Sequence, residues 1–293
     1  MVVISLGSFI SERTFPAYHP KNKKGILTLI TGREDGRIHI PGAIEFMRDK
    51  YADALNRQDL ERMREYFRAR KTGNNSINKY QAYIRAILAW GADQELISRN
   101  PWRDYKRLPI KRKIVTTTMS DIRDIYACAP DWLKWAMLTM YALSLRPGHV
   151  ELFGILWNSF NWQRGYVLVK QGKSGKIKTV FPPQRYLEIA AQKYAEDMAS
   201  GIPWVCHRRG SKVLNYRKAW DQAVKKAGLP HIPMYNIRHV AASEMLAQGA
   251  DLASVAAQLG HSNVNTTGST YAHITAGGQQ RAASLMPGIQ EDE

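Results

Sequence analysis

The chain has few cysteines, no long apolar run and fewer acidic than basic residues, and each shortage excludes a class of protein. Its two cysteines, Cys128 and Cys206, are too few for a disulfide framework and lie outside any metal-binding spacing. No apolar stretch approaches the ~20 residues that a membrane-spanning helix needs. The sequence also lacks a glycine-rich cofactor loop. We therefore expect a reduced, cytoplasmic protein with no metal, no cofactor and no membrane contact.

The imbalance of charge points to an anionic partner. The 42 Lys and Arg residues against 25 Asp and Glu residues leave a net charge of +17. Such a field attracts polyanions and accelerates their encounter with the protein. Nucleic acid is therefore one candidate partner. A solvated basic surface on an enzyme of anionic metabolites fits the charge equally well.

Length and composition favour two domains. The 293 residues are 44% hydrophobic, which suffices for more than one core. Residues 1–40 carry no pattern that assigns them a role. We expect a helical domain over residues 41–112, a linker over residues 113–119, and a second domain over residues 120–293.

The first domain is predicted to be helical. Residues 43–70 show a helical and heavily charged pattern, and Asn75 or Ser76 can cap a new helix after it. In that next helix, apolar residues recur at three- and four-residue steps and predict one buried stripe. Lys79 and Arg85 lie off the stripe and are expected to face outward. The stripe consists of Ile77, Tyr80, Ile84, Ile87 and Leu88.

The second domain mixes helices with one hairpin. Ser120 is expected to cap its first helix, and Gly249 and Gly260 are expected to stop later ones. Residues 166–180 alternate in polarity around a glycine-lysine turn, which predicts a β-hairpin. The fold class is therefore expected to be mostly α with a small antiparallel β-sheet. Helical patterns cover residues 132–143, 184–199, 215–227, 235–248 and 251–259.

The last quarter of the chain gathers residue types that handle phosphate. Arg238 and His239 precede Leu259-Gly260-His261, and a threonine-rich segment then leads to Tyr271. Phosphodiester transfer to a side chain needs a nucleophile, cations for the non-bridging oxygens, a general acid and a general base. A tyrosine phenol has a pKa of ~10, so it attacks only when its neighbours help to remove the proton.

The order and spacing of these motifs resemble the active site of the tyrosine recombinase (phage integrase) family. The resemblance spans roughly residues 118–285 and implies the catalytic domain of that family. It implies that Tyr271 attacks a DNA phosphate and forms a 3′-phosphotyrosine link. Arg238 would clamp this phosphate through its fork of donors, and His261 would donate a hydrogen bond to it. Each residue alone would more often be structural; their combination favours the catalytic interpretation.

The resemblance assigns roles to residues upstream as well. Arg146, after a predicted buried helix, would be the other phosphate-binding arginine, and Glu151 would orient the phosphate-binding groups from behind. Lys173, at the tip of the predicted hairpin, would protonate the departing 5′ oxygen. The hairpin offers further candidates for that role, namely Lys170, Lys176 and Lys178.

Three features depart from the usual pattern of the family. Tyr235 stands where a histidine usually precedes the second arginine, and His239 is the residue that could compensate. Tyr271 lies ten residues after His261 (261 to 271), where nine is commoner. The extra residue is expected at 267–269, where a glycine makes a bulge easy. The third departure is the acid, Glu151, which lies five residues after the first arginine (146 to 151) rather than three.

The resemblance also implies how DNA is held. Residues 41–112 would be the core-binding domain, which with the catalytic domain forms a two-domain clamp around double-stranded DNA. The basic segment around Pro109 would also suit an ordinary solvated linker. Residues 282–286 could form a short helix that docks on a neighbouring protomer. The candidate DNA contacts are Lys79, Arg85, Lys111, Arg112 and Lys113.

The main hypothesis is a site-specific tyrosine recombinase, the integrase of a phage or another mobile element. It would act as a homotetramer on DNA in the cytoplasm, associated with the nucleoid, with DNA-bending or excision proteins as candidate accessory partners. One alternative is a catalytically impaired DNA-binding integrase remnant or regulator, which Tyr235 and the altered spacings motivate. Another is a type IB topoisomerase, which would relax a plasmid that lacks a recombination site.

Overall fold

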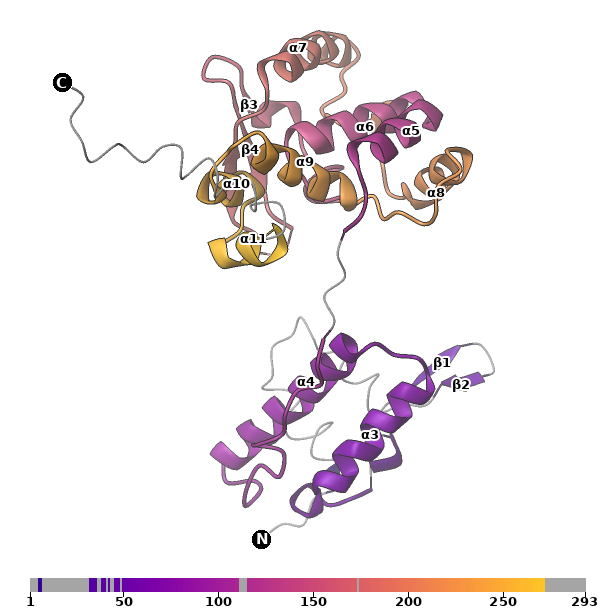
Figure 1. Cartoon of the computed structure of the whole chain (residues 1–293), viewed down its shortest axis with the longest axis vertical. Helices are drawn as coiled ribbons and strands as arrows, with labels where there is room; N and C mark the ends of the chain where they lie inside the picture. Colours follow the sequence, from indigo (N-terminus) through magenta and orange to yellow (C-terminus); the bar gives the residue numbers. More distant parts are fainter. Residues whose placement is uncertain are drawn as a thin grey trace, which may run out of the picture. The chain divides into compact units, whose positions relative to one another are not determined.

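The computed structural model describes most of the chain, which divides into two compact units. These units are Met1–Lys113 and Ile114–Glu293, and each is described by itself. Figure 1 shows the helices and strands of both. The roles assigned above to the domains stay predictions. The described residues are 5–6, 32–35, 38–40, 42, 45–47, 49–110, 115–172 and 174–271.

Among the described residues of the first unit, a short hairpin is followed by helices. The helical pattern predicted over residues 43–70 is confirmed as a regular α-helix only after Asn56, which caps that helix. Its side chain accepts a hydrogen bond from the Asp59 N–H at 3.2 Å, and the Asp59 carboxylate accepts one from the Asn56 N–H at 3.0 Å. This capping box defines where α3 begins. The elements are β1 (Arg33–Asp35), β2 (Ile38–Ile40), η3 (Glu45–Met47), η4 (Ala52–Ala54), α3 (Arg57–Ala69) and α4 (Asn74–Asp93).

The apolar stripe of α4 faces the core of this unit, as predicted. Tyr80 stacks on Phe67 of α3, with the ring centroids 4.8 Å apart. The cap predicted at Asn75 or Ser76 is wrong, because α4 already begins at Asn74. The buried members of the stripe are Ile77, Ile84, Ile87 and Leu88.

The second unit is mostly helical, with small antiparallel sheets, which confirms the predicted fold class. The three-stranded sheet has the order β3-β4-β5, and β6 pairs with β7. Its helices are α5 (Met119–Cys128), α6 (Asp131–Ala142), α7 (Gln184–Ala199), α8 (Arg217–Lys226), α9 (Asn236–Ala247), α10 (Leu252–Leu259) and α11 (Val264–Tyr271). The other elements are η5 (Trp157–Ser159), β3 (Phe160–Asn161), β4 (Tyr166–Lys170), β5 (Ile177–Val180), β6 (His207–Arg208) and β7 (Ser211–Lys212).

The five helices predicted by range, α6 to α10, follow those ranges to within two residues, but the helix α11 was not predicted and the first cap was predicted at the wrong residue. Thr118, rather than Ser120, caps α5: the Asp121 N–H donates to the Thr118 hydroxyl at 3.2 Å, and the Asp121 carboxylate accepts from the Thr118 N–H at 2.7 Å. Ser120 therefore lies inside the helix. Of Thr118 and Ser120, only Thr118 is followed three positions later by an acidic residue, Asp121. The reciprocal hydrogen bonds with Asp121 therefore make Thr118 the cap.

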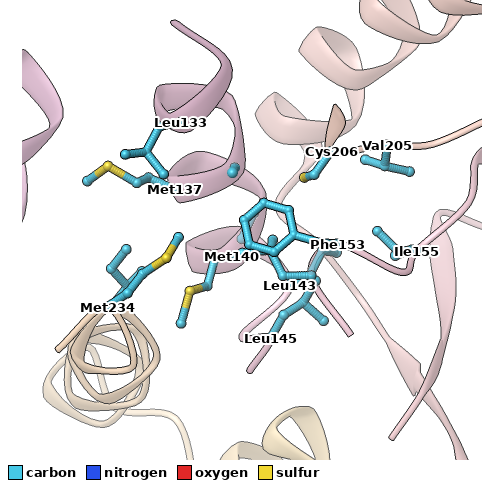
Figure 2. Packing of buried hydrophobic residues seen from close by; sticks show 14 of the residues in the cluster. Leu133, Met137, Met140, Leu143, Leu145, Phe153, Ile155, Val205, Cys206 and Met234 are labelled. Atoms are coloured by element: carbon cyan, nitrogen blue, oxygen red, sulfur yellow. The ribbon is translucent and has the colours of Figure 1, made fainter. Parts of the chain in front are cut away.

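The core of the second unit is built around α6. This helix packs against α9, and α5 packs against α8. Figure 2 shows Met137 and Met140 of α6 beside Met234, which comes just before α9. The core therefore holds two segments in place: the loop after α6, which carries Arg146, and the first turn of α9, which carries Arg238.

The hairpin predicted over residues 166–180 is confirmed as β4 and β5. Their antiparallel register pairs Val167 with Val180 and Val169 with Lys178. All four of these side chains are buried, because alternate positions of a strand face the same side. The hairpin therefore buries a lysine on its inner face. Within the described residues, no helix combines the length and apolarity that crossing a membrane requires.

Candidate active site

Arg238 lies in the first turn of α9 and is buried, with 1% of its surface exposed. Its Nη1 donates to the Ser144 carbonyl oxygen at 2.5 Å, and its Nη2 donates to the Leu259 carbonyl oxygen at 2.6 Å. A buried charge is tolerated when its donors are satisfied in this way. The guanidinium thus joins the loop after α6 to the C-terminal end of α10.

His261 follows Gly260, which ends α10 in the left-handed conformation with φ +71°. Its Nε2 lies 3.4 Å from Arg238 Nη2, and its Nδ1 lies 2.8 Å from Thr267 Oγ1. Arginine can only donate, so Nε2 faces it as an acceptor and Nδ1 carries the hydrogen. Burial, together with the positive charge of Arg238 and its neighbours, lowers the pKa of His261 to about 4. The imidazole is therefore neutral at physiological pH.

Arg146 and Glu151 form an ion pair beside the hairpin. Arg146 Nη1 donates to Glu151 Oε1 at 2.7 Å, and its backbone N–H donates to Oε2 at 2.9 Å. Glu151 Oε1 also accepts from the Gly172 N–H at 3.2 Å. Burial alone would raise the pKa of Glu151, but the hydrogen bonds from Arg146 outweigh it and lower the pKa. The carboxylate thus stays charged and holds the arginine next to β4.

The acid of this pair lies outside the helices of the unit. Glu151 lies in a run of turns after α6, and it is buried whereas the Arg146 side chain keeps 28% of its surface exposed. The loop between the two residues bends back so that one carboxylate binds both the backbone and the side chain of Arg146. The five-residue spacing thus allows a direct contact between the acid and the arginine.

Tyr271 is the last residue of α11, and only 4% of its surface is exposed. The polar residues that precede it in the sequence do not indicate this burial. It packs in a small cluster with Leu246 of α9 and with Val255 and Leu259 of α10. Burial raises the pKa of its hydroxyl to about 12, although the charge of Arg238 acts in the opposite direction.

The glycine bulge expected at residues 267–269 is also wrong. α11 runs unbroken through Gly268 to Tyr271. A methyl group at Gly268 would lie 3.2 Å from Leu252 Cδ2. The glycine therefore serves the close packing of α11 on α10.

His239 lies between two tyrosine rings. Its ring centroid is 5.0 Å from that of Tyr235 and 5.9 Å from that of Tyr271. Its Nδ1 is 2.8 Å from the Tyr271 hydroxyl oxygen. Tyr235 itself interacts with Arg146: burial lowers the pKa of Arg146, but Glu151 and Tyr235 together raise it above its ordinary value.

Lys178 is a site residue whose role the sequence did not single out. It is 8% exposed, and its Nζ donates to the Gln258 carbonyl oxygen at 2.9 Å. Burial, together with the charge of Arg238, lowers the pKa of this lysine to about 7. The signal that could have found it is the alternation of β5, which places Lys178 on the same face as Val180.

The hairpin presses closely on the end of α10. Gln171 Nε2 donates to the Gly260 carbonyl oxygen at 2.8 Å. A Cβ at position 260 would overlap Gln171 Nε2 and lie 2.7 Å from Lys178 Cδ. Glycine is therefore needed both for the positive φ and for this contact. The hairpin and the backbone before His261 are thus one packed assembly.

The family model described as "Phage integrase family" matches residues 110–277. The chain belongs to the phage integrase family. Family members are tyrosine recombinases, enzymes that cleave and rejoin DNA. The tyrosine recombinase XerA of Thermococcus kodakarensis is 26% identical over 223 residues, covering 73% of this chain and 76% of the relative. Transposase A from transposon Tn554 of Staphylococcus aureus is 24% identical over 188 residues, covering 58% and 52%.

Solved structures of the family share the fold of this chain. A lambda integrase tetramer bound to a Holliday junction superposes with a TM-score of 0.69 at 16% identity, covering 89% of this chain and 78% of that one. The Tn1549 transposon integrase in complex with a circular intermediate DNA gives a TM-score of 0.73 at 13% identity, covering 96% and 99%. The likeness thus extends over most of the chain.

Several predicted site residues lie outside the described residues, namely Lys173, Lys111, Arg112 and Lys113. The suggested docking helix at residues 282–286 does so as well. Lys79 and Arg85 are exposed on α4, as predicted, and lie over the rings of Tyr83 and Tyr105 at 5.8 and 5.7 Å. The described part of the chain contains no cluster of His, Cys, Asp and Glu placed to bind a metal ion.

Proposed function

We propose that this chain is a site-specific tyrosine recombinase, the integrase of a phage or another mobile element. It cuts and rejoins double-stranded DNA through a 3′-phosphotyrosine intermediate. One observation carries the proposal: in a chain of this family, the Tyr271 hydroxyl lies 2.8 Å from Nδ1 of His239, the residue that follows the buried Arg238 on α9. His261 contacts the guanidinium of Arg238. A nucleophile thus adjoins groups that bind phosphate.

The cleavage step assigns one role to each group. The Tyr271 oxygen attacks the phosphorus, a bond to phosphorus forms, and the bond to the 5′ oxygen breaks. Arg146 and Arg238 neutralise the charge that develops on the non-bridging oxygens. Lys173 gives its proton to the departing 5′ oxygen, as in the family. The 5′ hydroxyl of a partner strand reverses the step, so the bond energy is conserved without ATP.

His261 changes its protonation when the substrate arrives. In the free protein it is neutral, with Nε2 facing Arg238. A bound phosphate brings negative charge close to the imidazole, and this raises its pKa. The imidazole can then take a proton at Nε2 and donate it as a hydrogen bond to a phosphate oxygen.

Strand exchange needs more than one protomer, because the attacking strand comes from a second duplex. We therefore propose a homotetramer on DNA, in line with the lambda integrase tetramer on a Holliday junction. The net charge of +17 supports a tight electrostatic hold on the duplex. The reaction takes place where such DNA is found, in the cytoplasm of a bacterial or host cell. Accessory DNA-bending or excision proteins stay a prediction.

Covalent trapping tests the mechanism. The protein is mixed with nicked duplex fragments of the genome that encodes it, so that the short cleaved strand diffuses away and the adduct accumulates. We expect an adduct with wild type and none with Tyr271→Phe. The proposal is wrong if wild type gives no adduct, or if Tyr271→Phe gives the same one.

A second function is a DNA-binding descendant that does not cut. Two observations favour it: Tyr235 replaces the usual histidine, and the nucleophile is buried with a raised pKa. One relative of this chain, 22% identical over 237 residues, is named putative defective protein IntQ of Escherichia coli. Such a protein would retain genomic fragments in a salt-dependent way without forming an adduct.

A further inference from the structure

We propose that His239 is the general base that removes the proton from the Tyr271 hydroxyl during cleavage. This inference rests on the proposed function and supplies the one role that it leaves open. His239 projects from α9 and Tyr271 ends α11, and the distance between His239 Nδ1 and the phenol oxygen is 2.8 Å. A general base must lie within hydrogen-bond reach of the proton that it takes, and this pair meets that requirement.

The direction of this hydrogen bond follows from the partners of each atom. Among the described residues, Nδ1 is the partner that the Tyr271 hydroxyl has. A phenol that is almost fully buried must place its own hydrogen on an acceptor, so the O–H donates and Nδ1 accepts. The imidazole hydrogen is then on Nε2.

The Nε2 atom offers a way out for the proton. It has no protein partner among the described residues, and it is not among their buried unpaired atoms. His239 itself is half-buried, which leaves part of its side chain accessible to water. A proton taken at Nδ1 makes the ring an imidazolium, which can pass a proton to water from Nε2.

The charges around His239 keep it in the basic form. Burial, and then the positive charge of Arg238, lower its pKa below that of a free histidine. The other titratable groups that face it are Tyr235, Tyr271 and His261. A bound phosphate would offset the charge of Arg238 and favour the imidazolium that forms. Substrate binding would thereby promote the proton transfer.

The neighbouring residues are worse placed for this role. Both nitrogens of His261 are engaged, one by Arg238 and the other by Thr267. Tyr235 occupies the position of the usual histidine, but a neutral phenol has no basic nitrogen. His239, one helical turn after Tyr235, instead brings an imidazole to the nucleophile.

The step balances as a proton transfer coupled to substitution at phosphorus. The O–H bond of Tyr271 breaks and its proton moves to His239 Nδ1, while the oxygen forms its bond to phosphorus. The bond from phosphorus to the 5′ oxygen breaks, and that oxygen takes a proton from the general acid. In rejoining, the Tyr271 oxygen leaves as a phenolate and takes the proton back from His239.

Two substitutions of His239 test the role in single-turnover cleavage of the nicked duplex found by trapping. His239→Asn keeps an acceptor near the position of Nδ1 but cannot hold the proton, so we expect cleavage to slow by ~10²-fold, with a rate that rises with pH. His239→Ala leaves space beside the phenol, and added imidazole should restore much of its rate. The matched control is His231→Asn, an exposed histidine outside the site, which should cleave like wild type.

The outcomes separate this inference from the proposed function. Absence of an adduct with wild type would overturn the function itself. An adduct with wild type, together with unchanged cleavage by His239→Asn, would overturn the base and leave the function standing. A slow His239→Ala variant that imidazole does not accelerate would also overturn it and assign His239 a structural role. Melting curves of each variant, with retained DNA binding, establish that the fold is intact.

Discussion

The burial and the pKa of Lys178 are set by the residues that surround it in the fold. On an exposed turn it would be an ordinary cation, but on the inner face of β5 it donates to the end of α10 within reach of two arginines. Its charge is held there at a cost in free energy, because burial disfavours the ammonium form. The same site buries Arg238, whose guanidinium keeps its charge and is stabilised by two carbonyl hydrogen bonds.

We predict a pH-dependent contribution of Lys178 to stability. Its pKa is about 7 in the folded protein against 10.5 for the free side chain, so between these values the unfolded chain binds more protons. The free energy of unfolding should therefore rise with pH in this window, by at most about 1.4 kcal/mol per pH unit, and this rise should be missing in Lys178→Met. Urea unfolding of both proteins at pH 7, 8 and 9 measures it; a difference between them that does not change with pH would contradict the prediction.

Among the secondary-structure elements, the β4–β5 hairpin and α10 are joined by several hydrogen bonds. The side chain of Gln258 donates to the Phe181 carbonyl oxygen at 2.9 Å and accepts from its N–H at 3.2 Å. With the bonds from Gln171 and Lys178, this fixes the strand pair to the helix end that precedes His261. A small displacement of the hairpin would therefore move the phosphate-binding groups.

Gly260→Ala should disrupt this junction more than its backbone conformation alone explains. Gly228 has the same φ of +71°, but a Cβ added there would have nothing within 4 Å, so Gly228→Ala is the matched control. We expect Gly228→Ala to cost about 1 kcal/mol of stability, from the left-handed backbone. Gly260→Ala should cost more, because its methyl group meets Gln171 and Lys178, and it should also slow cleavage. Equal losses of stability and unchanged cleavage in both variants would refute this view of the junction.

The helices of the second unit were predictable, whereas their caps and crowded contacts were not. Periodic apolar residues are a local signal, so α6, α7 and α10 follow from the sequence to within two residues. The caps at Asn56 and Thr118 depend on a reciprocal bond to an acid three residues later, which the periodicity of apolar residues does not reveal. The helical course of α11 through Gly268 depends on Leu252 of another helix.

For the whole molecule, the main feature is an excess of positive charge, which both units carry. Members of this family act on DNA, and a duplex presents phosphate along its whole length, so an excess of positive charge is expected in such a protein. In the first unit, exposed Lys79 and Arg85 remain candidate contacts to that backbone.

We predict that each of these two side chains contributes one phosphate contact. Lys79→Gln and Arg85→Gln should each weaken DNA binding and reduce the slope of log affinity against log salt by about 1. Lys79→Arg and Arg85→Lys keep the charge and should leave the slope unchanged. Fluorescence anisotropy with a duplex over a series of salt concentrations gives the slopes. Identical slopes for the neutral and charged replacements would remove these residues from the interface.

The sequence by itself determined the family, the helical periodicity and the hairpin, because each depends on residue types and spacings along a short stretch of chain. It also named the groups of the site, from Arg146 to Tyr271. Only the tertiary structure decided which of these side chains are in contact. The bond between His239 and Tyr271 joins residues 32 positions apart, and that between Lys178 and Gln258 joins residues 80 apart. Burial and pKa follow from such contacts, since they depend on what the folded chain packs around each group.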